Sequence, residues 1–106
     1  MTNDFPEAKD FFGAYFHQDW PVEHDTADQV IDDFLRNSDK AVLILVRNEL
    51  RALLSNKLNE IDLRAFFLKE LHCYYCYWNE WASGEAWLRH IERKLNENLA
   101  DYHARL

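Results

Sequence analysis

Ala41-Val-Leu-Ile-Leu-Val46 is the longest apolar run of the chain, and its conformation decides the fold. Six apolar residues fit a buried strand or the start of a buried helix equally well. The apolar pattern continues beyond the run at positions Leu50, Leu53, Leu54 and Leu58, with Arg47, Asn48, Arg51 and Ser55 opposite. A pattern of about 18 residues exceeds the usual length of a strand and therefore predicts a central helix.

The segments around this helix carry further helix start and stop signals. A first helix is expected from near Pro6, with Asn3 or Asp4 as its cap, and should end before Trp20-Pro21, because proline excludes the preceding residue from helical angles. Thr26 and Gln29 have the spacing of a capping box. The other expected breaks and caps are Asn37-Ser38-Asp39, Asn59 or Asp62, and Ser83.

Composition agrees with a helical domain. The chain has 106 residues, the size of one domain, and 48% of them are hydrophobic, enough for a core. Two glycines and two prolines leave few residues for hairpin turns. Residues 72–81 have five aromatic rings and poor periodicity, which predicts a helix end and a packed loop. The sequence thus predicts an all-α fold: a compact single-domain bundle of about five helices over residues 1–106.

Charge is distributed unevenly along the chain. Residues 1–33 have nine acids and one base, a formal charge of −8, whereas residues 34–106 sum to +1. This balance argues against direct binding of nucleic acid or an anionic membrane, both of which require clustered bases. An acidic surface bearing aromatic residues instead favours a basic protein partner. No apolar run is long enough to span a bilayer and no secretion signal is present, so a cytoplasmic location and reduced thiols are expected.

Chemistry-bearing motifs are scarce. Cys73 and Cys76 have thiol-redox spacing, but such motifs follow a strand and begin a helix, and this pair follows a helix. With His72 they would supply three zinc ligands, without a fourth at the usual spacing. No phosphate-binding glycine loop or nucleophile elbow is present. We therefore expect no catalytic residue, no metal and no cofactor.

Residues Tyr15-Phe16-His17-Gln18-Asp19-Trp20 resemble the signature of the CdiI-type immunity proteins of contact-dependent growth inhibition. The pair Trp87-Leu88 inside the last helix matches the same family pattern. The resemblance implies a small cytoplasmic protein that is not an enzyme. Such a protein neutralises the C-terminal toxin domain of its cognate CdiA, and a 1:1 heterodimer is expected. It also implies a mainly structural role for the six motif residues and Trp87, because family members face toxins of different activity.

The charge pattern and the resemblance together predict a toxin-binding surface. Many such toxins are nucleases, and a nuclease presents a basic cleft that acidic side chains can fill. The expected acidic contacts are Glu23, Asp25, Asp28, Asp32 and Asp33, and the expected aromatic anchors are Trp20, Tyr74, Tyr77, Trp78 and Trp81.

Two other functions stay open on the sequence alone. One is a small acidic adaptor or regulator that binds another basic protein, such as a transcription factor. The other is a metal- or thiol-dependent enzyme built on His72, Cys73 and Cys76. The neighbouring gene would decide the first alternative, and metal analysis of the purified protein the second.

Overall fold

The computed structural model describes the backbone of residues 5–104 and the side chains of residues 5–101. Within this part the chain is all α, as predicted, and no strand occurs. The elements are α1 (Pro6–Tyr15), α2 (Trp20–Glu23), α3 (Ala27–Asn37), α4 (Lys40–Ser55), α5 (Glu60–Lys69), the 3-10 turn η1 (Tyr77–Asn79) and α6 (Gly84–Ala104). The apolar run that decides the fold is therefore the first half of a helix, α4.

Four predicted caps are confirmed. In each, a side-chain oxygen accepts a hydrogen bond from a backbone N–H of the first helical turn: Thr26 from Gln29 (3.2 Å), Asp39 from Val42 (3.1 Å), Asn59 from Asp62 (2.8 Å) and Ser83 from Ala86 (3.1 Å). The Gln29 side chain also reaches back, to the N–H of Asp25 (2.8 Å). Local sequence therefore sets where α3 to α6 begin.

The N-terminal helices differ from the prediction in two ways. The proposed caps Asn3 and Asp4 lie outside the described residues, and the carboxylate of Glu49 on α4 accepts hydrogen bonds from the N–H groups of Glu7 (3.2 Å) and Ala8 (2.8 Å). After α1, the chain forms the short helix α2, which was not expected. Pro21 is accommodated there because proline is tolerated in the first turn of a helix.

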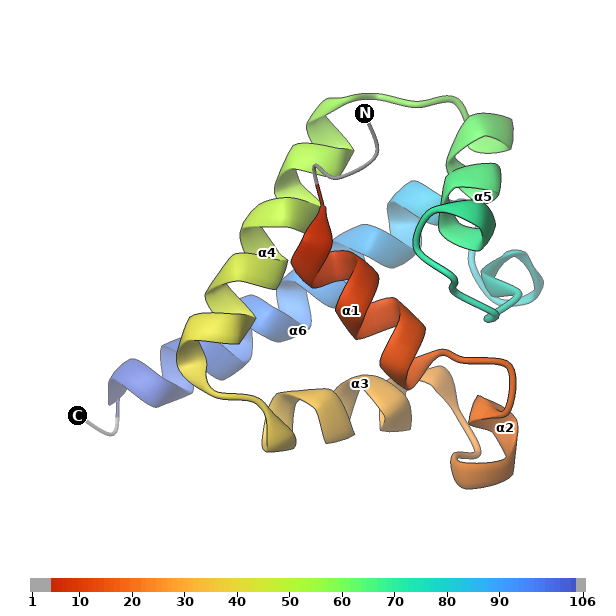
Figure 1. Cartoon of the computed structure of the whole chain (residues 1–106). Helices are drawn as coiled ribbons and strands as arrows, with labels where there is room; N and C mark the ends of the chain where they lie inside the picture. The colour runs from red at the N-terminus through yellow and green to blue at the C-terminus, as the bar shows by residue number, and fades with distance from the viewer. Residues whose placement is uncertain (1–4, 105–106) are drawn as a thin grey trace.

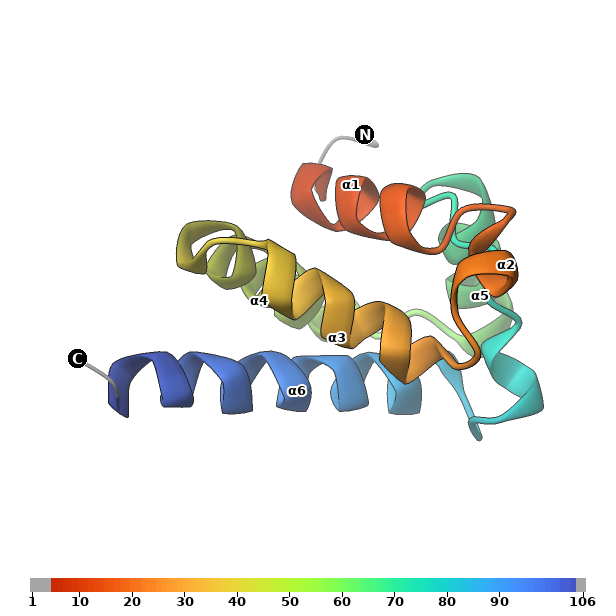
Figure 2. The same cartoon turned by 90° about the horizontal axis from the view of Figure 1, so that it is seen from below.

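The helices are stacked in layers (Figures 1 and 2). α6 packs along α4, while α1 packs against α4 and α3. Figure 2 shows α1 and α6 on opposite sides, with α3 and α4 between them. Both views place α5 and α2 at the same end of the molecule. That end also holds the aromatic segment that connects α5 to α6.

Trp87 of α6 is the centre of an aromatic core. Its side chain is fully buried, and five rings from α1 and its C-cap, α5 and the connecting segment surround it at centroid distances of 4.7–5.9 Å: Phe12, Phe16, Phe67, Tyr75 and Tyr77. One ring on the last helix thus holds three parts of the chain together.

Among the described residues, no helix combines the length and apolarity needed to cross a bilayer.

Candidate functional site

The motif Tyr15–Trp20 packs into the aromatic core and against the segment before η1. Phe16 is fully buried, and its carbonyl accepts a hydrogen bond from the N–H of Tyr74 (2.8 Å). The half-buried Trp20 packs on the rings of Phe16 and Tyr75, with ring centroids 5.8 Å and 5.6 Å away. The motif therefore positions α2 and the aromatic segment relative to each other.

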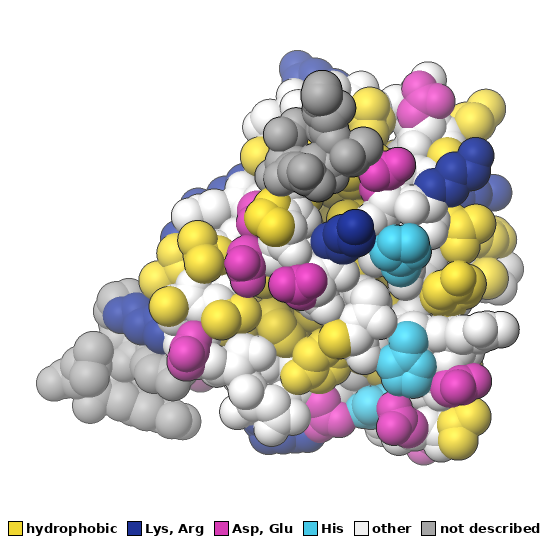
Figure 3. Space-filling model, in the orientation of Figure 1, with side chains coloured by type: hydrophobic (Ala, Val, Ile, Leu, Met, Phe, Trp, Pro, Cys, Tyr) yellow, Lys and Arg dark blue, Asp and Glu magenta, His cyan; other side chains and the backbone are white. Residues whose placement is uncertain are grey.

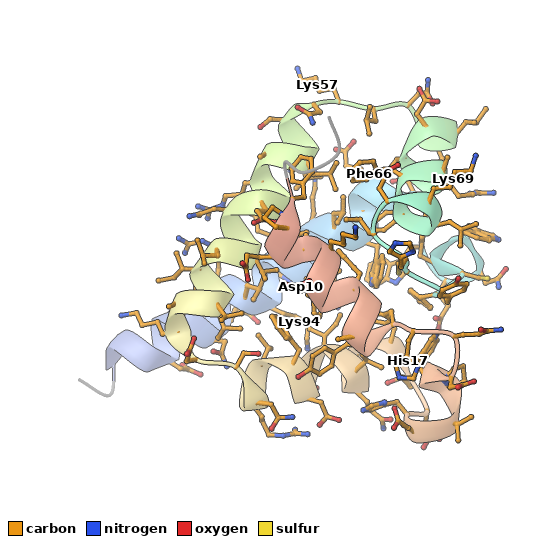
Figure 4. All side chains as sticks on the ribbon, in the orientation of Figure 1. Asp10, His17, Lys57, Phe66, Lys69 and Lys94 are labelled. Carbon is orange, nitrogen blue, oxygen red and sulfur yellow. The ribbon has the colours of Figure 1, made fainter. Side chains whose placement is uncertain are left out.

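The polar residues of the motif form the turn between α1 and α2. The N–H of Asp19 donates to Nδ1 of His17 (3.1 Å), and Nε2 of the same imidazole lies 3.3 Å from a Glu23 carboxylate oxygen. His17 lies at the α2 end of the molecule in Figure 4. Gln18 is exposed. These contacts fix the backbone that leads into the predicted acidic surface.

Glu23, Asp25, Asp28, Asp32 and Asp33 are hereafter called the acidic face. Asp28 Oδ1 is 3.0 Å from His90 Nε2, and Asp32 Oδ1 is 2.9 Å from Lys94 Nζ. Both partners belong to α6, and Lys94 extends from α6 towards α3 (Figure 4). The side chains of Asp28 and Asp32 remain about half exposed while making these contacts. They can therefore hold α3 on α6 and still offer negative charge to a partner.

The other three acids are less tied to the helix bundle. Asp33 pairs with His24 and Arg36, both close in sequence. Glu23 and Asp25 are exposed. The side chains of Arg36 and Lys94 offset part of the charge of the face, and its five acids still outnumber these two bases.

The predicted aromatic anchors divide into exposed and buried rings. Tyr74 and Trp78 expose nearly half of their surface, and the half-buried Trp81 packs on the His90 ring at 4.7 Å. Tyr77 corrects the prediction: its side chain has no exposed surface, and its hydroxyl donates to Glu60 (2.7 Å). Burial raises the pKa of this hydroxyl, which stays protonated and fills the core.

A hollow of about 520 Å³ lies between α5 and residues 73–78, and we call it the α5 groove. Its outer wall is formed by Ile61 and Leu68 of α5, which are 81% and 49% exposed. The guanidinium of Arg64 lies over the Trp78 ring at 4.2 Å. Figure 3 shows apolar side chains at the edge of the molecule where Figure 1 places α5.

Sequence reasoning missed the α5 side of this groove. Ile61, Ala65 and Leu68 follow one another at i, i+4 and i+7, a second apolar stripe beside the buried stripe of Leu63 and Phe67. Two apolar stripes on one short helix indicate that one of them has no partner inside the domain. These two stripes are the feature of the sequence from which an exposed apolar surface on α5 could have been predicted.

The two cysteines do not form a reactive centre. Cys73 is buried and Cys76 is exposed, and both are free thiols. Burial raises the pKa of the Cys73 thiol to about 12, so it is inert at neutral pH. Across the described part of the chain, no three His, Cys, Asp or Glu side chains gather in a geometry that could hold a metal ion. The geometry gives no support to the metal- or thiol-enzyme alternative.

Comparison with known proteins assigns the family. The family model of the CdiI immunity protein matches residues 4–95, which include the motif, the acidic face and the α5 groove. The chain belongs to the CdiI immunity protein family. It is also similar, with a TM-score of 0.85 and 29% sequence identity, to a chain in the crystal structure of the CdiA-CT/CdiI complex from Y. kristensenii 33638. The alignment covers 91% of this CdiI family member and 97% of that chain. A search among curated proteins found no match.

Proposed function

We propose that this CdiI family member binds the C-terminal toxin domain of a cognate CdiA as a 1:1 heterodimer in the cytoplasm and neutralises it. The observation that carries the proposal is the family match over residues 4–95, together with the likeness to a chain of a CdiA-CT/CdiI complex. The protein acts by binding, without catalysis and without direct contact to nucleic acid.

The toxin is proposed to be a nuclease that the acidic face blocks. A nuclease cleft is basic because it holds a phosphate backbone, and carboxylates at the surface can replace the phosphates. Asp28 and Asp32 support this role, since each is half exposed and held in place by α6. Preorganised charges lose little conformational freedom on binding, which favours high affinity.

Four aromatic residues at or near the end of the molecule that holds α2 and α5 complete the proposed contact surface. They are Trp20, Tyr74, Trp78 and Trp81, and each is partly exposed. Trp20 packs on Phe16, Trp78 on Tyr77 and Trp81 on His90, while Tyr74 lines the α5 groove. Rigid rings with one exposed side are typical of interface hot spots. Tyr77 has no part in this surface because it is buried.

The acidic face is tested by neutralising charge without removing hydrogen-bond acceptors. The variant Asp25→Asn/Asp28→Asn/Asp32→Asn keeps an oxygen near His90 and Lys94. A matched control, Asp10→Asn/Glu97→Gln/Asp101→Asn, changes the net charge equally at exposed acids of α1 and α6. Affinity for the purified toxin domain is measured by calorimetry at low and high salt, and RNA cleavage by the toxin is measured in parallel.

The first variant is expected to bind at least about tenfold more weakly than wild type, or about 1.4 kcal/mol, with a smaller salt dependence. The control should stay close to wild type. Equal losses in both variants would show that only net charge matters and that the acidic face is not the binding site. A wild-type protein that forms no complex would overturn the proposed function.

A further inference from the structure

The α5 groove is an apolar surface without a partner inside the domain. Ile61, Leu68, Tyr74 and Trp78 lie around it with 43–81% of their surface exposed. Among the large apolar residues whose side chains are described, Val22 on α2 is as exposed as Ile61, at 84%. Soluble monomers rarely expose several large apolar side chains together, and such patches mark interaction sites. The groove therefore fits an apolar partner.

Two of the three charged residues that line the groove, Glu60 and Arg64, already have contacts within the protein, and the third is Lys69. Glu60 accepts hydrogen bonds from the Tyr77 hydroxyl (2.7 Å) and the Gly84 N–H (2.9 Å), and Arg64 lies over the Trp78 ring. A small-molecule site needs a few polar groups that converge on the ligand. Lys69 alone does not provide such a set of converging groups, so the groove favours apolar side chains of a macromolecule over a polar small molecule.

The groove adjoins the Asp28 part of the acidic face through one residue. Tyr75 lines the α5 groove and also lines a second hollow, formed with Thr26, Ala27, Asp28, Glu80 and Trp81. A partner that covers the acidic face thus reaches the groove by extending across Tyr75. A second copy of this chain fits poorly, because groove-to-groove packing would bring two chains of net charge −7 together with their acidic faces near the contact.

We infer that the α5 groove receives apolar side chains of the toxin domain, beside the basic surface that meets the acidic face. This inference rests on the proposed function and deepens it. The interface is then bipartite: the acidic face steers encounter and sets the association rate, while the groove holds the bound toxin and sets the dissociation rate.

Leu68→Ser tests the groove, and Leu45→Ser is its matched control. Leu68 is 49% exposed in the groove, and Leu45 is 47% exposed on α4, which Figure 1 places on the opposite side of the molecule from α5. Ile61→Ser provides a second groove variant. Binding to the purified C-terminal toxin domain of the cognate CdiA is followed by surface plasmon resonance at two salt concentrations, after circular dichroism has shown that each variant is folded.

Both groove variants should raise the dissociation rate at least about fivefold while the association rate and its salt dependence stay within about twofold of wild type. Leu45→Ser should match wild type. A wild-type complex whose dissociation rate is the same in all variants overturns the inference and leaves the proposed function in place. If the wild-type protein forms no complex with the toxin domain, both the inference and the proposed function are overturned. Light scattering measures the oligomeric state of the free protein. If the wild-type protein is a dimer and Leu68→Ser makes it a monomer, the groove binds a second copy of this chain and the inference is overturned.

Discussion

At the scale of single residues, the segment that connects α5 to α6 alternates between core and solvent. Cys73, Tyr75 and Tyr77 are buried, whereas Tyr74 and Cys76 are exposed. This period of two is that of an extended backbone, and it explains why the segment has no helical periodicity. Two cysteines three positions apart therefore have opposite environments.

The first prediction concerns thiol reactivity. At pH 8, iodoacetamide should modify Cys76 and leave Cys73 unmodified in the native protein, because Cys73 is buried and burial raises its pKa to about 12. Mass spectrometry should find one adduct per native molecule and two after unfolding in urea. Native Cys76→Ser should gain none. Rapid modification of both thiols in the native protein would contradict the burial of Cys73.

The second prediction concerns stability at alkaline pH. Burial raises the pKa of Cys73, Tyr75 and Tyr77 above their ordinary values of 9.0 and 10.0, so the folded state keeps protons that the unfolded state loses. These groups stabilise the fold fully below pH 9, and their contribution falls progressively above it. Urea unfolding should show a free energy of unfolding that is lower at pH 10.5 than at pH 8.

Tyr77→Phe is the control for this titration. It removes one of the three groups and should lessen the decrease of unfolding free energy between pH 8 and pH 10.5, whatever its effect on stability at pH 8. An unfolding free energy that is equal at both pH values in the wild type would contradict the account.

At the scale of elements, two helices depend on carboxylates that are distant in sequence. Glu49 of α4 accepts hydrogen bonds from the first turn of α1, and Glu60 of α5 accepts one from the first residue of α6. Each contact satisfies N–H groups that have no partner within the helix, and each places a negative charge at the positive end of a helix dipole. The caps therefore also fix how the helices are joined.

The third prediction is that Glu49→Ala destabilises the protein by about 1–3 kcal/mol, because it leaves part-buried N–H groups of α1 without an acceptor. Asn48→Ala, at the neighbouring exposed position of α4, should change stability by less than about 0.5 kcal/mol. Chemical denaturation measures both. Equal stability of the two variants would show that the Glu49 cap contributes nothing.

The fourth prediction compares alanine substitutions at the two glycines, Gly84 and Gly13. A Cβ on Gly84 would lie 2.7 Å from Leu63 Cδ2 and 3.0 Å from the Tyr77 hydroxyl, whereas a Cβ on Gly13 would meet its nearest neighbour at 3.9 Å. Gly84→Ala should therefore lower the melting temperature by disturbing the packing of α5 on α6. Gly13→Ala should raise it, since alanine stabilises a helix interior by about 0.5–1 kcal/mol relative to glycine. Shifts of the same sign would contradict the packing around Gly84.

At the scale of the whole molecule, the domain joins a hydrophobic core to two surfaces of different character. Trp87 holds the rings of the motif, α5 and the connecting segment together. Tyr75 lines both the α5 groove and the hollow that contains Asp28 of the acidic face. The proposed function assigns the motif a mainly structural role and assigns the choice of partner to the charges and apolar side chains at this end.

The sequence predicted what depends on local pattern. The helical class, the caps of α3 to α6 and the helical state of the run at Ala41–Val46 all follow from spacing within a few residues. It did not predict the Glu49 cap, because that contact joins positions 41–42 residues apart. Ile61 and Leu68 were missed because either apolar stripe of α5 can face the core, and only the packing of α5 on α6 decides between them.

The most direct measurement is the growth of bacteria that express the C-terminal toxin domain of the cognate CdiA together with this chain. The wild-type chain should restore growth. Leu45→Ser should do the same, and a folded variant that combines the three acidic-face substitutions with Leu68→Ser should restore growth much less at equal protein level. Growth that stays arrested with the wild-type chain, or that is restored equally by the combined variant, would contradict the account.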